Sequence, residues 1–353
     1  MANLYAGRRA IKRAAHINGV DRDSMIDRII EAESRRIDRR TRRFFIPKAE
    51  TRLYRWPQDQ TMPGDVLWLD QDLISLTTLK TKAQNSSPTT IAAADYFLEP
   101  NNTGPPYNRI EIDQSSTSAF EGGDTPQRSI SVLGSWGYSD DTKSTGTVSS
   151  GLSSDATATT MVCSDSSLID VGDTLLIESE QIFVSEVASA ALGSILLDDA
   201  SVTKDLAGVT ITVDGSHGLN AGEVILIDSE KMYISSIATN DLTVIRAYDG
   251  SLVATHSDNT AIHAFRTLTI ERAVNGTTGA THADATAISV YEPPFDIRNL
   301  CMAETLAAYQ QEQAGFSGDI GTGEGAAEFD GTGLSGLRKD VLGYYRRRRE
   351  AAI

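Results

Sequence analysis

The chain has few cysteines and no long apolar run, and each shortage excludes a class of protein. Two cysteines, Cys163 and Cys301, cannot build a disulfide framework or a cysteine-based zinc cluster. No run of about 18 apolar residues is present, so no segment is predicted to span a bilayer. Residues 1–23 lack the apolar stretch of a secretory signal. We therefore expect a soluble protein of a reducing compartment, with no membrane partner.

Aromatic residues and proline are also scarce. Aromatic residues make up 7% of the 353 residues, so valine, isoleucine and leucine must build much of the core. Proline is absent between Pro126 and Pro293. The acidic excess lies in the same region, because residues 140–292 carry a net charge of −16 and residues 1–43 carry +6. At about 100–200 residues per domain, the length predicts two or three domains.

These shifts in composition predict one domain inserted into another. The outer domain comprises residues 1–139 and 292–353, and the acidic insert comprises residues 140–291. Residues 140–155 are rich in serine, threonine and glycine and are interpreted as a linker into the insert.

Helical spacing marks four segments of the outer domain. Residues 21–43 place apolar side chains at intervals of three and four, with Asp21 or Asp23 as the N-cap. Shorter or weaker patterns predict three further helices, at residues 3–16, about 295–314 and about 335–350.

Between residues 47 and 139 the apolar period shortens to that of strands and hairpins, with a helical turn allowed near 91–96. The fold class predicted for the chain is α+β. It has a helical bundle core with short β-hairpins, plus an inserted all-β repeat domain that is barrel-like or sandwich-like.

The insert contains internal repeats. Residues 170–187 align with 220–237, and residues 242–265 align with 268–291. In the first pair of repeats, apolar stretches flank a Ser-Glu step, which predicts a β-hairpin that turns at Ser-Glu.

Several motifs in or near the repeats suggest chemistry but have simpler interpretations. His256 and His282 both lie in Ala-Thr-His-x-Asp, and Glu180 and Glu230 both follow serine. Because each occupies an equivalent place in a repeat, we favour turns bonded to the backbone for the histidines. For the glutamates we favour hairpin tips or exposed strand faces over catalytic or metal sites. The glycine-rich residues 321–325 lack the lysine of a phosphate loop and are interpreted as a linker. We expect no enzyme and no cofactor.

Two basic runs are candidates for partner contacts. One lies at the end of the predicted helix 21–43 and comprises Arg35, Arg36, Arg39, Arg40, Arg42 and Arg43; the other comprises Arg346, Arg347, Arg348 and Arg349. They are interpreted either as solvated helix-end charge or as contacts with an acidic partner or with phosphates.

Several segments, taken in order, resemble head–tail connector (adaptor) proteins of tailed bacteriophages. They are DRIIEAESRRIDRRTRRFFIPKAETRLYRWP, the strand LISLTTLKT, DYFLEPNNTGPPYNRIEID, ISVLGSWGYS and PPFDIRNLCMAETLAAY. The last of these follows the Gly-Tyr-Ser step closely in the family, but here the insert displaces it by about 150 residues. The resemblance covers residues 1–139 and 292–353.

The resemblance implies a structural virion protein at the head–tail interface, assembled in the host cytoplasm. Its copies would form a dodecameric ring between the portal and a tail-side neck protein, and DNA would pass through without sequence-specific binding. By family analogy the C-terminal segment contacts the portal, so the candidates are Leu337, Val341, Tyr344, Tyr345 and Arg346 to Arg349. The arginines of residues 35–43 are candidates for ring or partner contacts.

Two alternatives remain at this point. One is a decoration or receptor-binding protein that uses the β repeats to contact a capsid or host surface. The other is a carbohydrate-active or metal-dependent enzyme built on the repeats, for which the sequence offers no convergent set of acid and base groups.

Overall fold

The chain is mostly β, in a computed structural model that describes residues 3–58, 64–152, 157–199, 201–207, 209–313, 319–320, 327–328 and 332–347. Strands account for 38% of it and helices for 21%, with two large antiparallel sheets. The predicted helical bundle core with short hairpins is therefore wrong. Local periodicity identifies strands singly, whereas the pairing that joins them into sheets depends on residues far apart in the sequence.

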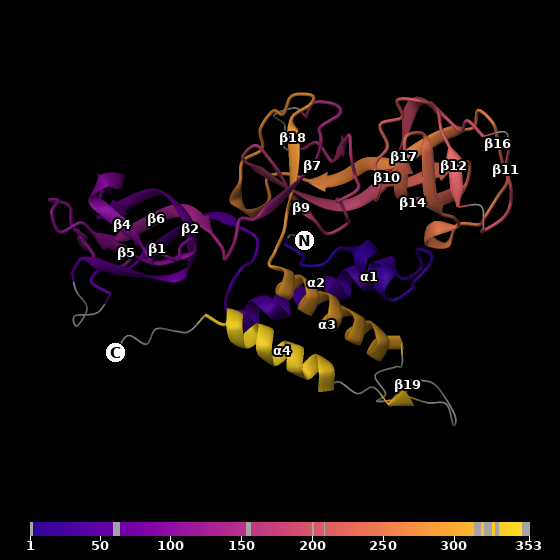
Figure 1. Ribbon diagram of the computed structural model, residues 1–353. Coiled ribbons are helices and arrows are strands. Elements are labelled where there is room, and N and C mark those ends of the chain that lie inside the picture. The colour runs from indigo at the N-terminus through magenta and orange to yellow at the C-terminus, as the bar shows by residue number, and fades with distance from the viewer. Residues whose placement is uncertain are drawn as a thin grey trace.

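Four helices from both ends of the chain form a helical unit: α1 (Arg8–Ala14), α2 (Asp23–Thr41), α3 (Phe295–Gln313) and α4 (Thr332–Tyr345). Figure 1 shows α2, α3 and α4 side by side, with α1 between them and the inserted strands. All four predicted helices are confirmed: α1, α2 and α3 are shorter than predicted, and α4 both begins and ends before its predicted bounds. No helix in the described residues is long and apolar enough to cross a membrane.

The start of α2 differs from the prediction. Arg22 precedes the helix, and neither Asp21 nor Asp23 caps it with a side-chain hydrogen bond. At the other end Arg42 adopts a left-handed conformation (φ 58°), and its N–H donates to the Asp38 carbonyl at 2.7 Å. This reversal ends the helix and directs the following residues into the core.

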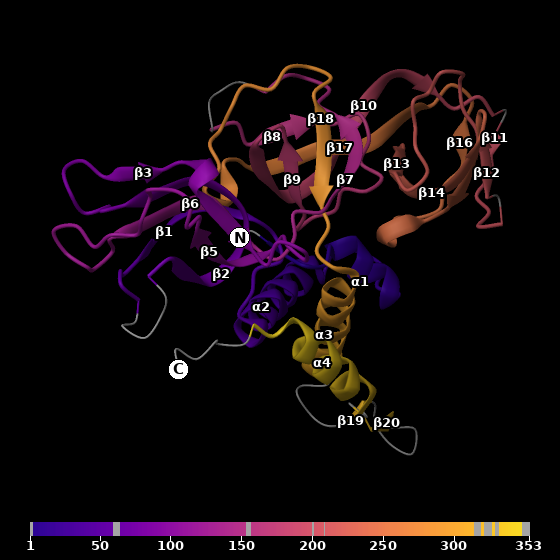
Figure 2. The ribbon, with the colours of Figure 1, turned by 60° about the vertical axis from the view of Figure 1, so that its left-hand side comes forward.

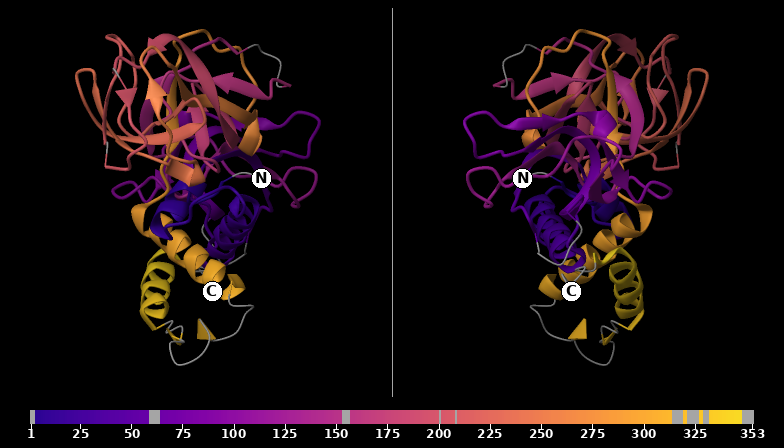
Figure 3. Two further views of the ribbon diagram at one scale, coloured as in Figure 1. Left: turned by 90° about the vertical axis from the view of Figure 1, so that its right-hand side faces the viewer. Right: turned by 90° about the vertical axis from the view of Figure 1, so that its left-hand side faces the viewer.

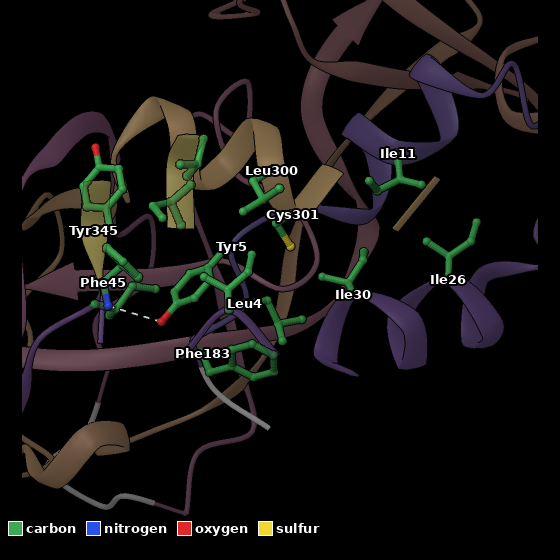
Figure 4. Packing of buried hydrophobic residues seen from close by; sticks show 14 residues of the cluster. Leu4, Tyr5, Ile11, Ile26, Ile30, Phe45, Phe183, Leu300, Cys301 and Tyr345 are labelled. Atoms are coloured by element: carbon green, nitrogen blue, oxygen red, sulfur yellow. Dashed lines mark hydrogen bonds between the residues drawn. The ribbon is translucent and has the colours of Figure 1, made fainter. Parts of the chain in front are cut away.

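Figure 4 shows the core of the helical unit, in which Ile11 of α1 meets Ile26 and Ile30 of α2. All three isoleucines are fully buried. Burying a side chain of this size contributes about 1.5–3 kcal/mol, so the apolar spacing of α2 accounts for its position. One core residue, Phe183, comes from the insert, which is therefore packed against the helices.

Residues 48–136 form a sheet unit with a separate core. Its strands are β1 (Lys48–Tyr54), β2 (Val66–Thr81), β3 (Thr89–Ile91), β4 (Tyr96–Glu99), β5 (Tyr107–Ile112) and β6 (Ile130–Trp136). They pair in the order β1-β6-β2-β5-β4, with β3 on β2. The expected strand LISLTTLKT is the second part of the longer, 16-residue strand β2. The helical turn predicted near 91–96 is confirmed as η1 (Ala93–Asp95).

The insert consists of antiparallel strands: β7 (Thr142–Thr147), β8 (Thr160–Val162), β9 (Thr174–Ile177), β10 (Glu180–Leu196), β11 (Ser201–Val202), β12 (Thr210–Thr212), β13 (Val224–Ile227), β14 (Glu230–Ala238), β15 (Asp241–Ile245), β16 (His256–Ser257), β17 (Ala261–Glu271) and β18 (Ala287–Tyr291). Ten of them form one sheet, and β11 pairs with β16. Figure 2 shows two lobes joined by the long strands β10 and β17. Each lobe has its own buried apolar cluster.

The two ends of the insert lie side by side. Thr142 of β7 is the pairing partner of Tyr291 of β18, the last strand before α3. The prediction that residues 140–155 form a linker is wrong for the residues that are described there. Val148 and Leu152 continue beyond β7 as isolated bridges, and both are buried.

The sequence repeats correspond to equivalent hairpins. In β9–β10 Ile177 pairs with Glu180, and in β13–β14 Ile227 pairs with Glu230. The turns therefore fall at residues 178–179 and 228–229, one residue before the predicted Ser-Glu step. Both turns begin with a residue of positive φ, Glu178 at 54° and Asp228 at 53°.

A last pair of short strands, β19 (Asp319–Ile320) and β20 (Ala327–Glu328), lies between α3 and α4. Figures 2 and 3 show this pair at the end of the helical unit that lies farthest from the two large sheets.

Candidate functional site

Each hairpin repeat places a glutamate at the start of its second strand, inside the lobe. Glu180 accepts hydrogen bonds from Arg272 at 2.9 and 2.6 Å and from His282 at 2.8 Å. Glu230 accepts them from Arg246 at 2.7 and 2.7 Å and from His256 at 2.9 Å. The two clusters occupy equivalent repeat positions.

These clusters are fully bonded and closed to solvent. Glu180 and Glu230 have no exposed surface, so the prediction of hairpin tips or an exposed strand face is wrong for them. The other ring nitrogen of His256 bonds to Asp228, and that of His282 bonds to Glu178, both at 2.8 Å. The histidines thus bond to carboxylates and not, as predicted, to the backbone.

The bonding pattern indicates what the clusters can do. Both ring nitrogens of each histidine are occupied, which leaves none for a metal ion, and no group of metal-ligating side chains is found in the described residues. A general acid or base must reach its substrate within hydrogen-bond distance, which these buried groups cannot do. The clusters therefore act as a framework that holds each hairpin to the loop beside it.

The same loops dock the insert onto the N-terminal segment. The loops contain η2 (Tyr248–Gly250) and η3 (Val274–Gly276). Asp249 of the first forms an ion pair with Lys12, and Asn275 of the second exchanges hydrogen bonds with Asn3 at 2.8 and 2.7 Å.

A cavity of about 470 Å³ lies beside this joint, between α1 and the insert. Its cationic groups are occupied. Arg8 pairs with Asp27 at 2.6 Å, and Arg9 donates to the backbone carbonyls of Ser167 and Ile169 at 3.1 and 3.0 Å. We interpret the cavity as part of the contact between the insert and the N-terminal segment.

A second cavity is a basic groove of about 660 Å³ between the end of α2 and one side of α4. Its lining residues are Arg39, Arg40, Arg42, Ser335, Arg338, Lys339, Leu342, Gly343 and Arg346. Six of these nine residues carry a positive charge. We call this surface the basic groove.

Most of these charges form no ion pair among the residues that the structure describes, although Arg39 acts at longer range on the Asp38 carboxyl and Arg40 on that of Glu33. Arg338 pairs with the buried Glu304 at 2.5 and 2.6 Å, which holds α4 against α3. The other cations of the basic groove form no ion pair or side-chain hydrogen bond with any described residue; they are Arg39, Arg40, Arg42, Lys339 and Arg346. A cluster of unpaired arginines is suited to carboxylates and phosphates, because the guanidinium fork matches both anions.

The predicted arginines in α2 and just after it divide into two sets. Arg39, Arg40 and Arg42 are exposed and line the basic groove. The remaining three pair within the chain. Arg35 pairs with Asp38 at 3.2 Å and Arg36 with the buried Glu33 at 3.0 Å. Arg43 pairs with Asp72 of β2 at 2.7 Å, so it joins the helical unit to the sheet unit.

The predicted portal-contact residues of α4 are divided in the same way. Val341 and Tyr345 are buried in the helical core. Leu337 and Tyr344 are exposed at the edge of this buried stripe, two turns apart, and Tyr344 keeps 76% of its surface in solvent.

The arginines that follow α4 also differ. Arg346 lines the basic groove, whereas Arg347 pairs with Asp72 and donates to the Leu69 carbonyl at 2.8 Å. Arg348 and Arg349 lie outside the described residues, as do the glycine-rich residues 321–325.

Sequence reasoning missed Arg338 and Lys339 in the basic groove. The signal was available, because they lie two turns before Arg346 on the same predicted helix, where a shared face brings them together. It also missed Asp72, which two arginines from opposite ends of the chain share.

Comparison of the chain with models of protein families, with curated proteins and with solved structures finds no match. The functional argument therefore starts from the geometry of the chain.

Proposed function

We propose that the chain is a head–tail connector protein of a tailed bacteriophage. Its copies form a ring, of twelve subunits by family analogy, between the portal and a tail-side neck protein, and the ring extends the channel for DNA. The protein works by binding its neighbours and performs no catalysis.

The observation that carries this proposal is the meeting of three aromatic residues that are distant in the sequence. Phe45 and Tyr138 lie in the first and fourth connector-like segments, and Tyr345 lies in α4, within the region 292–353 that the resemblance covers. Their rings make mutual contacts, with centroids 5.7, 5.4 and 5.2 Å apart. Aromatic rings at these centroid separations attract one another. The contacts therefore hold the three parts of the chain together despite the insert.

The placement of the insert supports the same proposal. Thr142 and Tyr291 are pairing partners, so the insert leaves and rejoins the connector-like parts at one place. In Figure 1 both of its lobes lie on one side of the helical unit, which leaves α4 uncovered on the other side. An additional surface domain of this kind is compatible with a ring.

The portal contact is proposed for the exposed side of α4. Leu337 and Tyr344 place apolar surface in solvent, two turns apart on one face. Aromatic and large apolar side chains supply much of the binding energy of protein interfaces. Val341 and Tyr345 support this face from the core.

Negative-stain electron microscopy of the full chain, alone and with a portal ring, tests the function. We expect rings in at least one sample, with the insert visible as knobs. A matched pair of variants tests the contact. Tyr344→Ser should weaken portal binding at least about tenfold, whereas Leu252→Ser, at an 83%-exposed position on the insert, should not. Monomers in both samples, with an undecorated portal, would contradict the proposal.

A second candidate, a decoration or receptor-binding protein, is favoured by one observation. The insert exposes Leu206, Val209 and Leu252 at 62%, 46% and 83% of their surface. Such side chains suit a surface contact. The Leu252→Ser variant separates the two functions, because a receptor-binding protein should lose attachment to cells or capsids and a connector should keep its rings.

A further inference from the structure

The basic groove combines a high positive charge with little apolar surface. Six of its nine described lining residues are cationic, and Leu342 is the one large apolar residue among the nine. Surfaces that bind proteins draw much of their binding energy from aromatic and apolar side chains. Surfaces that bind nucleic acid are more polar and far more positively charged. The composition of the groove therefore favours the phosphates of a nucleic acid over the surface of a protein.

The groove stays positively charged after its own carboxylate neighbours are counted. Arg39 and Arg40 act at longer range on two carboxyls of α2, but each of these carboxyls already has a closer arginine partner. Arg42, Lys339 and Arg346 form no ion pair with any carboxylate of the described residues. Like charges that line one hollow repel one another, so a chain of anions that enters the groove relieves the repulsion.

The α4 side of the groove follows one face of the helix. Ser335, Lys339, Leu342 and Arg346 succeed one another at intervals of three and four residues, which is the spacing of residues on one helix face. At a rise of 1.5 Å per residue, this face is about 16 Å long. Each strand of duplex DNA carries one phosphate per about 3.4 Å of the duplex axis, so a face of this length passes several phosphates.

The acidic insert, which would repel DNA, lies away from this face. Residues 140–292 carry a net charge of −16. Figure 1 shows both lobes of the insert on one side of the helical unit and α4 on the other, with α3 between them. A helix is about 10 Å wide, whereas charges in solvent are largely screened beyond about 8 Å at 0.15 M salt. The overall acidity of the chain therefore does not prevent a contact between the groove and DNA.

We propose that the basic groove binds the phosphate backbone of duplex DNA without reading its sequence. This inference rests on the proposed connector function, which makes duplex DNA the polyanion that passes the ring. Leu337 and Tyr344 remain the portal contact, so α4 has two surfaces with different partners. Contacts with the backbone carry no sequence information and let a protein slide along DNA, which suits a channel through which the genome moves.

A titration of labelled duplex DNA with the full chain tests the contact. The probe is a duplex of about 20 base pairs, and its fluorescence anisotropy is measured between about 50 mM and about 200 mM salt, where phosphate contacts weaken steeply. The groove variant carries Arg42→Gln, Lys339→Gln and Arg346→Gln. The control variant removes the same charge at exposed cations elsewhere, with Arg55→Gln, Arg128→Gln and Lys204→Gln.

The two variants should separate the groove from the overall charge of the chain. We expect the wild type and the control to bind DNA at about 50 mM salt and the groove variant to bind at least about tenfold more weakly. The slope of log affinity against log salt should become shallower by about three in the groove variant, because each lost phosphate contact removes about one unit. Duplexes of different sequence should bind equally, and circular dichroism verifies the fold of each variant.

Three results would overturn the inference. They are equal binding by the groove variant and the wild type, equal losses in the groove and control variants, and no binding by the wild type at about 50 mM salt. Polyglutamate that displaces the duplex at equal concentration of charge would also overturn it, because the occupant would then be an acidic protein segment. The connector function is tested separately by the rings in electron microscopy, so its failure appears there and not in the DNA titration.

Discussion

Arg246 and Glu230 form a two-pronged ion pair, with both nitrogen–oxygen distances 2.7 Å and neither side chain exposed to solvent. Arg272 and Glu180 repeat the arrangement in the other lobe. In each lobe the pair joins the start of a long strand to the loop that docks on the N-terminal segment. Its loss should therefore affect both the fold of the lobe and its attachment.

Replacing Arg246 with methionine should lower the free energy of unfolding by about 3–5 kcal/mol, because Glu230 then remains buried without its cation. Urea denaturation followed by circular dichroism measures the change. The matched control is Arg55→Met, at an exposed position, which should change the value by no more than about 0.5 kcal/mol. Equal effects at the two positions would contradict the buried pair.

The same clusters predict loss of stability in acid. Burial by itself would raise the pKa of Glu180, but hydrogen bonds from Arg272, the Ala280 N–H and His282 lower it to about 2. Equivalent bonds lower the pKa of Glu230 to about 2. Their usual value is 4.5, so their contribution is complete above that pH and is lost as the pH falls toward 2.

Melting temperatures measured between pH 6 and pH 2 test this sign. We expect a steep decrease below about pH 4.5 in the wild type and a shallower one in Glu180→Gln, which has one fewer carboxylate to protonate. A wild-type melting temperature that stays constant down to pH 2 would show that these carboxylates do not govern acid stability.

Asp173 should act in the opposite direction. Loss of surrounding water, followed by the nearby Asp170 carboxylate, raises the pKa of Asp173 to about 7 from a usual 3.8. Its contribution to stability is therefore complete below pH 3.8 and is lost as the pH rises through 7. Asp173→Asn should raise the melting temperature at pH 8, because the amide oxygen still accepts the Asp170 N–H that the carboxylate accepts at 2.7 Å.

The increase in melting temperature for Asp173→Asn should be greater at pH 8 than at pH 4, where the wild-type group is mostly protonated. Asp258→Asn, at an exposed aspartate, should show no such difference. A decrease at pH 8 would mean that the charged form of Asp173 stabilises the fold.

Two adjacent tyrosines on α4 offer a matched pair for the helical core. Tyr345 is 7% exposed and packs against Phe45 and Tyr138, whereas Tyr344 is 76% exposed. Tyr345→Ala should cost about 3 kcal/mol of unfolding free energy, as for other large buried aromatic residues. Tyr344→Ala should cost no more than about 0.5 kcal/mol. Thermal and urea unfolding measure the change in unfolding free energy for both variants. Similar costs for the two variants would contradict the buried position of Tyr345 in the structure.

The sequence predicted elements well where one short stretch contains the whole signal. The helices at α2 and α3 follow from apolar spacing, and the hairpins of the insert follow from the repeats. It predicted the sheets poorly, because β1 pairs with β6 across the intervening strands and the expected strand LISLTTLKT is only part of the 16-residue β2. Residues 142–147 resemble a linker in composition, yet they form a strand because β18 lies beside them.

The candidate site shows the same division. The sequence identified Arg39, Arg40 and Arg346 as exposed basic groups, but it grouped them with Arg43 and Arg347, which pair with Asp72. Charge is a property of each residue, whereas pairing depends on which carboxylate the fold brings near. For the same reason the sequence placed Glu180 at a hairpin tip or on an exposed strand face, although Arg272, 92 positions away, keeps it buried.

The sequence by itself therefore determined the four helices and the repeated hairpins, because neighbours within a few residues establish these. Only the tertiary structure decided that the chain is mostly β, that Phe183 of the insert completes the helical core, and that the cations of α2 and α4 form one groove. Those features come from contacts between residues tens to hundreds of positions apart. The free energy of such contacts cannot be inferred from a local sequence pattern.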